Sequence, residues 1–108
     1  MAAELVWLEE AEADLDAVGD HISTDSPQAA QAYVNSILAA CEKLSDFPLS
    51  GRQYNTRYRV LVVRNHLVFY RHDKGSNQVI IAAVVDGRRD VAQLVKYLPA
   101  RDNKRDPH

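Results

Sequence analysis

Arginine residues carry the strongest chemical signal in this 108-residue sequence. Residues 1–46 contain ten acidic residues against one basic residue, whereas residues 47–108 contain twelve basic residues against five acidic ones. Arginine makes planar, bidentate contacts with carboxylates and phosphates, so this segregation predicts a basic surface that binds an acidic partner or a polyanion. The signal rests on Arg52, Arg57, Arg59, Arg64, Arg71, Arg88 and Arg89.

Histidine and tyrosine residues allow a second chemistry, that of a metal-free ribonuclease. His66, His72 and Tyr97 can supply a general acid or base while arginines hold the phosphate and the 2′-hydroxyl attacks. None of the four histidines is paired at helical spacing with a carboxylate ligand, so neither a metal site nor a cofactor is expected.

The run Gly87-Arg88-Arg89-Asp90 follows the most apolar segment of the chain and precedes a predicted helix. Such a turn can present backbone N–H groups and arginines to an anion, but it lacks the glycine spacing and the lysine of nucleotide-binding loops. Two interpretations stay open. Either the arginines bind an anion, or Gly87 makes the turn while Asp90 caps the helix or pairs with an arginine. Cys41, the single cysteine, is expected to be a buried, inert thiol.

Composition limits the class of protein. With 46% hydrophobic and 26% charged residues, the chain is predicted to form one globular domain over residues 1–100, followed by a flexible polar tail at 101–108. No apolar run approaches the roughly 20 residues of a membrane span, and the acidic N-terminal segment does not resemble a signal peptide. A cytoplasmic location without membrane contact is therefore expected.

The first half of the chain predicts a short strand and two helices. Residues 3–7 favour a strand, and Leu8, Ala11, Leu15, Val18 and Ile22 then recur at intervals of three and four residues. Ser26-Pro27 provides a cap and a first-turn proline for a second helix that ends near Ser45. The short connection between these helices makes them an antiparallel hairpin, with the acidic residues of the first helix on its solvent side.

The second half predicts an antiparallel sheet from runs 57–64, 67–72 and 79–85, joined by short turns. The third run has no polar alternation, which indicates a central strand buried on both faces. One face would pack against the helical hairpin, and Val91, Leu94, Val95 and Leu98 would cover the other as a short helix ended by Pro99. The predicted fold class is α+β, in the order β-α-α-β-β-β with a C-terminal helix.

Several motifs in this order resemble the RelE/ParE superfamily of bacterial toxins. The resemblance spans about residues 4–95, implies a helical hairpin packed on an antiparallel sheet, and identifies the chain as a candidate toxin of a type II toxin–antitoxin system. It rests on Trp7, Asp14-Leu15, His21-Ile22, Ser26-Pro27-Gln28-Ala29-Ala30, Phe47-Pro48, Gly51-Arg52, Arg59-Val60-Leu61-Val62, His66-Leu67-Val68-Phe69-Tyr70-Arg71 and Val84-Val85-Asp86-Gly87-Arg88-Arg89-Asp90.

The two branches of this superfamily imply different activities. RelE-like members cut messenger RNA on the ribosome, and the matching residues here would be Arg57, Arg59, His66 and Arg88, but Leu67 and Ala92 stand where that branch has an arginine and a tyrosine. Phe69-Tyr70-Arg71 and the Gly87 motif are more similar to the ParE branch, whose members act on DNA gyrase. Asp86 departs from that branch, in which histidine often precedes the glycine.

The ParE-like interpretation is the leading hypothesis. It implies a protein without catalytic residues or cofactors that inhibits gyrase by binding, is neutralised by a ParD-like antitoxin in a possible hetero-oligomer, and does not itself recognise a DNA sequence. An isoelectric point near 6.0 agrees with a protein target, because ribosome-bound nucleases tend to be strongly basic. A non-toxic binding module is the third interpretation. The target or antitoxin contacts would be Arg59, Arg64, Arg71, Arg88 and Arg89.

Overall fold

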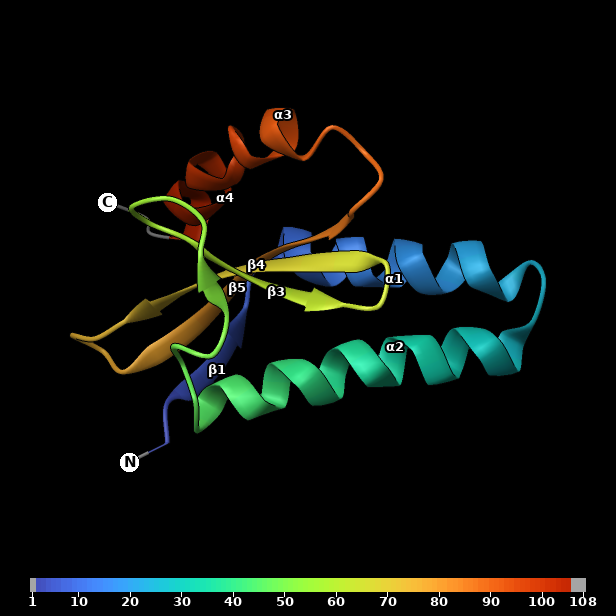
Figure 1. Cartoon of the computed structure of the whole chain (residues 1–108), viewed down its shortest axis with the longest axis horizontal. Coiled ribbons are helices and arrows are strands. Elements are labelled where there is room, and N and C mark those ends of the chain that lie inside the picture. Colours follow the sequence, from blue (N-terminus) through green and yellow to red (C-terminus); the bar gives the residue numbers. More distant parts are fainter. Residues whose placement is uncertain (1, 106–108) are drawn as a thin grey trace.

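The computed structural model describes residues 2–105 and contains a five-stranded sheet with helices on both faces. The chain order, shown in Figure 1, agrees with the predicted α+β class. The elements are β1 (Glu4–Trp7), α1 (Glu9–Ser23), α2 (Pro27–Glu42), η1 (Lys43–Ser45), β2 (Arg52–Gln53), β3 (Arg59–Val63), β4 (His66–Asp73), β5 (Gln78–Asp86), α3 (Val91–Val95) and α4 (Leu98–Arg105).

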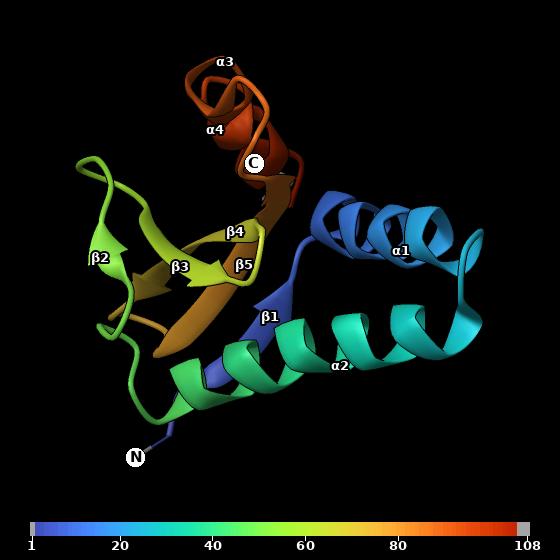
Figure 2. The ribbon, with the colours of Figure 1, turned by 45° about the vertical axis from the view of Figure 1, so that its right-hand side comes forward.

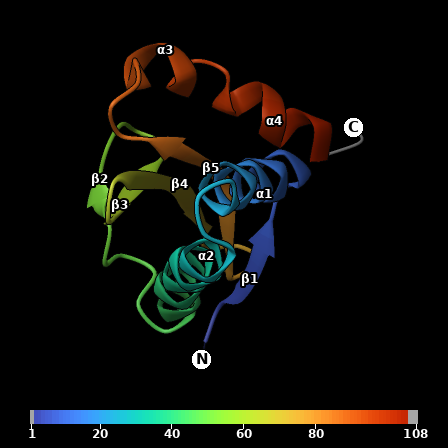
Figure 3. The ribbon, with the colours of Figure 1, turned by 90° about the vertical axis from the view of Figure 1, so that its right-hand side faces the viewer.

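The helices α1 and α2 form the predicted antiparallel hairpin and run side by side in Figures 1 and 3. Acidic residues occupy the first turn of α1, where the positive end of the helix dipole stabilises them. The α2 helix begins as its sequence predicts: the Ser26 hydroxyl accepts a hydrogen bond from the Ala29 amide at 3.1 Å, and Pro27 occupies the first turn.

The sheet has the strand order β1-β5-β4-β3-β2. Strands β3, β4 and β5 pair through antiparallel hairpins, as predicted, whereas β1 pairs in parallel with the first half of β5. The residues from Val79 to Val85 are all buried, which confirms the interior strand inferred from their unbroken apolar run. The sequence prediction missed β2, a two-residue edge strand with too few residues to show any periodicity.

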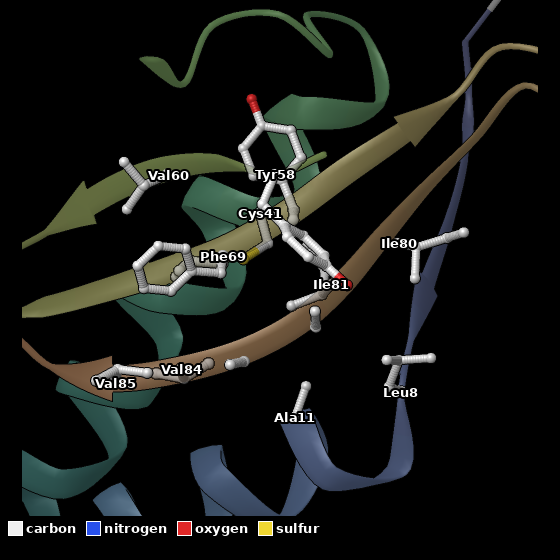
Figure 4. Close-up of a cluster of buried hydrophobic side chains, with 14 of the residues drawn as sticks. Leu8, Ala11, Cys41, Tyr58, Val60, Phe69, Ile80, Ile81, Val84 and Val85 are labelled. Atoms are coloured by element: carbon white, nitrogen blue, oxygen red, sulfur yellow. The ribbon is translucent and has the colours of Figure 1, made fainter. Parts of the chain in front are cut away.

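Two groups of helices cover the sheet. Helix α2 lies on one side of it, α3 and α4 lie on the other, and α1 lies beyond β5, as Figures 2 and 3 show. The buried core joins Leu8 and Ala11 to large side chains of the central strands, including Phe69 and Ile81 (Figure 4). Cys41 is fully buried there, and burial raises the pKa of its thiol to about 12, so it is an unreactive core residue.

The C-terminal segment differs from the prediction in two respects. Pro99 does not end a helix but lies in the first turn of α4, where its missing N–H is not needed. Residues 101–105 of the predicted flexible tail are helical, and Asp102 is only 4% exposed. The predicted domain boundary at residue 100 is therefore too early, and positions 106–108 of the predicted tail lie outside the described residues.

The packing of the loop around Gly51 predicts that adding one methyl group there will lower the stability of the protein. Tyr70 Oη accepts a hydrogen bond from the Gly51 amide at 2.9 Å and donates one to the Pro48 carbonyl at 2.8 Å. A Cβ atom at Gly51 would lie 2.7 Å from the Tyr70 ring and 2.8 Å from the backbone oxygen of Val60. Because that oxygen belongs to the sheet and cannot move aside, Gly51→Ala should cost about 2 kcal/mol of unfolding free energy.

Urea unfolding measures this loss, and Gly75→Ala is the matched control. A Cβ atom at Gly75 makes only an ordinary contact, 3.4 Å from Asp73, so this variant should stay within about 0.5 kcal/mol of wild type. Equal stabilities of the two variants would contradict the packing assigned to Tyr70.

Candidate partner-binding site

The five candidate contact arginines do not form one surface. Arg59 and Arg71 lie toward the end of the sheet that carries the β4–β5 turn, whereas Arg64, Arg88 and Arg89 lie at the opposite end, beside the β3–β4 turn. Arg59 is four residues from Val63, the partner of His66, which corresponds to roughly 13 Å along the strand. The sequence showed that these arginines are clustered in the second half of the chain but could not show that the fold separates them.

Three arginines at the β4–β5 end have structural contacts. Arg59 donates to the carbonyl oxygens of Leu49 and Gly51, at 3.3 and 2.7 Å, and so fixes the loop before β2. Arg71 makes a bidentate contact with Asp102, at 3.2 Å for both pairs of atoms, and Arg57 lies 3.5 Å from the same carboxylate. The contacts of Arg57 and Arg71 with Asp102 connect the sheet region to α4.

Asp102 is the residue that sequence reasoning missed most completely. Besides its contacts with Arg57 and Arg71, it accepts a hydrogen bond from the Tyr58 hydroxyl. Burial, together with this hydrogen bond, raises the pKa of Tyr58. Its neighbour Arg101 pairs with Asp14 of α1 at 2.7 Å and donates to the Ala82 carbonyl at 2.9 Å. Two adjacent residues thus hold helix α4 in place. Arg101 contacts α1 and β5, whereas Asp102 contacts β4 and the segment before β3.

At the β3–β4 end, Arg64 has an unusual backbone conformation. Its φ of 54° lies in the left-handed region, which glycine and asparagine adopt more readily. The guanidinium of Arg64 lies 5.5 Å from the centre of the Tyr33 ring, and its Nε donates to Ser36 Oγ at 3.2 Å. The two-residue turn therefore presents Arg64 beside α2 despite the backbone cost.

His66 and Tyr33 connect this turn to the helical hairpin. Tyr33 Oη lies 2.6 Å from His66 Nδ1 and accepts a hydrogen bond from the Asn65 amide at 3.2 Å. A hydrogen bond donated by the hydroxyl to Nδ1 places the imidazole proton on Nε2, whereas the reverse direction places it on Nδ1. Burial lowers the pKa of His66, Asp86 partly opposes this effect, and Arg88 adds to it, so the imidazole is neutral at pH 7.

The pKa shift of His66 predicts a pH-dependent stability. Because the folded state holds a proton on His66 less well than the unfolded state does, the unfolding free energy should fall as the pH drops below about 6.5. His66→Gln should flatten that part of the profile, whereas His21→Gln, at an exposed position of α1, should leave it unchanged. Urea unfolding between about pH 5 and 8 measures the effect, and superimposable wild-type and His66→Gln profiles would contradict it.

In the Gly87 motif, the structure shows the helix cap that the second interpretation of its sequence predicted. The Arg88 side chain is 77% exposed and pairs with Asp86 at 2.9 Å, and the hydrogen bonds from Arg88 hold the pKa of Asp86 below its usual range. Asp90 caps α3 by accepting from the Gln93 amide. Arg89 is exposed and has no carboxylate within 4 Å among residues 2–105.

A cleft of about 570 Å³ joins these groups to α1. Its apolar wall comes mainly from the second half of α1 and from Val84, and its polar rim comes from the β3–β4 turn and the end of β5. Apolar side chains adjoin charged groups within the cleft, which are the carboxylates of Asp14 and Asp86 and the guanidinium groups of Arg88 and Arg89. The lining residues include Val18, Ile22, Tyr33, His66, Arg88 and Arg89.

The described residues hold few other candidates. No group of three or more histidine, cysteine, aspartate or glutamate residues is arranged to hold a metal ion within the part of the chain that the structure covers. None of the helices within residues 2–105 is long and apolar enough to cross a membrane. His72 and Tyr97, the other acid–base candidates, do not line the cleft. His72 lies on β4, and Tyr97, between α3 and α4, lines an adjoining pocket that shares Asp14 and Arg89 with the cleft.

The helical hairpin, the sheet and the basic motif after β5 together define a small toxin of the RelE/ParE superfamily. Residues 5–91 match the family model described as ParE toxin of the type II toxin–antitoxin system, parDE. The chain therefore belongs to the ParE toxin family of type II toxin–antitoxin systems. It is also 39% identical over 61 residues to Toxin RelE2 of Caulobacter vibrioides, across 56% of this chain and 69% of that protein.

Solved structures share the fold at lower identity. The chromosomal ParDE toxin–antitoxin system from P. aeruginosa matches with a TM-score of 0.68 and 23% identity, over 79% of this chain and 96% of that one. The RelBE2 toxin–antitoxin complex from Mycobacterium tuberculosis matches with a TM-score of 0.61 and 18% identity, over 80% and 99%. A mutant of E. coli toxin RelE in the free state matches with a TM-score of 0.63 and 12% identity, over 98% of this chain and 99% of that one.

Proposed function

We propose that this toxin inhibits DNA gyrase by direct binding, without covalent chemistry of its own, and that a ParD-like antitoxin neutralises it. The observation that carries the proposal is the separation of the candidate nuclease residues. At one end of the sheet, Arg57 contacts Asp102 and Arg59 contacts carbonyl oxygens of a loop. Near the other end, His66 contacts Tyr33 and Arg88 contacts Asp86. In a nuclease, the general acid or base must reach the same phosphate that the arginines bind. The separation of Arg57 and Arg59 from His66 and Arg88 does not favour such a shared site.

The cleft is the proposed antitoxin site. An amphipathic segment with an apolar face and acidic residues would bury the apolar wall near Val18 and Ile22 and pair with Arg88 and Arg89. Arg64, in the β3–β4 turn next to the lining residue Asn65, would add a third charged contact. The family model names parDE, and two of the similar structures are a ParDE system and a RelBE2 complex. The toxin and its antitoxin would form a cytoplasmic hetero-oligomer, and the toxin alone would not recognise a DNA sequence.

Purified toxin provides the direct test of gyrase inhibition. Supercoiling of relaxed plasmid by gyrase should stop when toxin is added, linear DNA from cleavage complexes should accumulate after denaturation, and prior addition of antitoxin should abolish both effects. Unimpaired supercoiling at a large molar excess of folded toxin would overturn the proposal.

A second candidate is a ribosome-dependent messenger-RNA endonuclease that uses Arg57, Arg59, His66 and Arg88. The 39% identity to a protein named Toxin RelE2 favours it. Primer extension on translated messages separates the two candidates, because only the nuclease produces site-specific cuts in cells that express the toxin. Normal growth after induction without antitoxin would instead support the third candidate, a non-toxic binding module.

The Arg64→Asn substitution should weaken antitoxin binding and leave the unfolding free energy almost unchanged. Asparagine relieves the left-handed backbone at this turn, which gains about 1 kcal/mol, while loss of the contact with the Tyr33 ring costs about as much, so the unfolding free energy should change by less than about 0.5 kcal/mol. Antitoxin affinity, measured by calorimetry, should nevertheless fall about tenfold as one charged contact is lost. Unchanged affinity would exclude Arg64 from the interface.

A further inference from the structure

A second depression lies at the β4–β5 end of the sheet, remote from the cleft. Its volume is about 310 Å³, and three segments of the chain line it: the region before β3 together with the start of that strand, the end of β4, and the turn that follows. Its charged and polar lining includes Thr56, Arg57, Arg59, Arg71, His72 and Lys74.

The charges of this depression are not balanced. Arg57 and Arg71 share one carboxylate, that of Asp102, whose side chain is only 2% exposed and lies outside the lining. Arg59 contacts only carbonyl oxygens, and Lys74 has no carboxylate within 4 Å among residues 2–105. Each guanidinium has more N–H donors than these contacts use, so donors remain available for a ligand.

His72 provides a second, independent observation. Its Nε2 lies 3.2 Å from Asn77 Oδ1, an atom that can only accept, so Nε2 is the donor in this contact. Nδ1 is buried and has no hydrogen-bond partner among the described residues. Buried polar atoms are normally paired, so Nδ1 is a polar atom beside the depression that the described residues leave unsatisfied.

We propose that this depression binds a phosphate group. A carboxylate is satisfied by one bidentate contact, whereas a phosphate offers several oxygens and up to two negative charges to cations that converge from different directions. Arg57, Arg59 and Arg71 supply planar donors from two strands and a loop, and Lys74 supplies a point charge from the turn. The phosphate is either free inorganic phosphate or the phosphate of a mononucleotide.

Nuclear magnetic resonance of the full ¹⁵N-labelled chain tests the proposal. Sodium phosphate and adenosine monophosphate are titrated separately at pH 7, with the ionic strength held constant by sodium chloride. Binding should produce saturable shifts of the Thr56 and His72 amides. A lower dissociation constant for adenosine monophosphate than for phosphate identifies a nucleotide site, and equal dissociation constants identify a site for the phosphate alone.

Charge-neutralising variants complete the test. Arg57→Gln and Lys74→Gln should each raise the dissociation constant about tenfold, the loss expected for one charge-assisted contact. Lys96→Gln removes an exposed charge outside the depression and should leave binding unchanged. No saturable shift with either titrant would overturn the proposal, as would an equal weakening in Lys96→Gln, which would reveal only a general attraction to anions.

Discussion

Asp102→Ala is expected to lower the unfolding free energy by about 3 kcal/mol, the largest effect of any single side chain considered for this toxin. The substitution leaves Arg71, whose side chain is 20% exposed, without its counter-ion and removes the acceptor of the Tyr58 hydroxyl. Removing one partner of a buried pair costs more than the pair itself contributes, because the remaining charge is left unpaired in a poorly solvated place.

Two further variants give that measurement its controls. Asp102→Asn keeps the shape and one acceptor oxygen but loses the charge, so its stability should lie between those of wild type and Asp102→Ala. Asp16→Asn removes an exposed carboxylate of α1 and should change the unfolding free energy by less than about 0.5 kcal/mol. A loss of under about 1 kcal/mol for Asp102→Ala in urea unfolding would show that α4 is not held by this carboxylate.

The second large effect concerns activity rather than stability. Under the proposed function, the double variant Arg88→Ala/Arg89→Ala should need about 100-fold more toxin to inhibit gyrase, because two charged contacts worth about 1.5 kcal/mol each are lost. Both side chains are exposed, and Arg88 contacts only Asp86, so the fold should persist. Supercoiling assays measure potency, and circular dichroism checks the fold.

Lys43→Ala/Lys96→Ala is the matched control for that experiment. It removes the same number of positive charges from exposed positions outside the cleft and should retain wild-type potency. Equal losses in the two double variants would mean that net charge, and not the motif after β5, determines inhibition. Loss of antitoxin affinity with full gyrase inhibition would assign Arg88 and Arg89 to the antitoxin interface alone.

Local patterns in the sequence were sufficient to predict most of the fold. Helix periodicity, the Ser26-Pro27 cap and the unbroken apolar run 79–85 each depend on neighbours within a few residues, and each was confirmed. Pro99 was misinterpreted because proline both stops a helix and begins one, and the sequence alone does not distinguish the two roles. The two-residue strand β2 carried no pattern to detect.

The candidate site was predictable only in part, because the roles of arginines depend on distant partners. Arg71 was predicted to contact a target, but its bidentate partner Asp102 lies 31 residues away in a segment that was expected to be flexible. Arg88 and Arg89 could be located because their motif is local and resembles that of the superfamily. The hydroxyl contact of Tyr33 with His66, 33 residues away, left no trace in local spacing.

The parallel pairing of β1 with β5 has a kinetic consequence. Glu4 lies opposite Gln78, 74 residues further along the chain, so β1 can join the sheet only after a long loop has closed. Contacts of such sequence separation slow folding, whereas the local α1–α2 and β3–β4 hairpins can form early. Newly synthesised toxin should therefore pass through a period in which the β1 side of β5 is still unpaired.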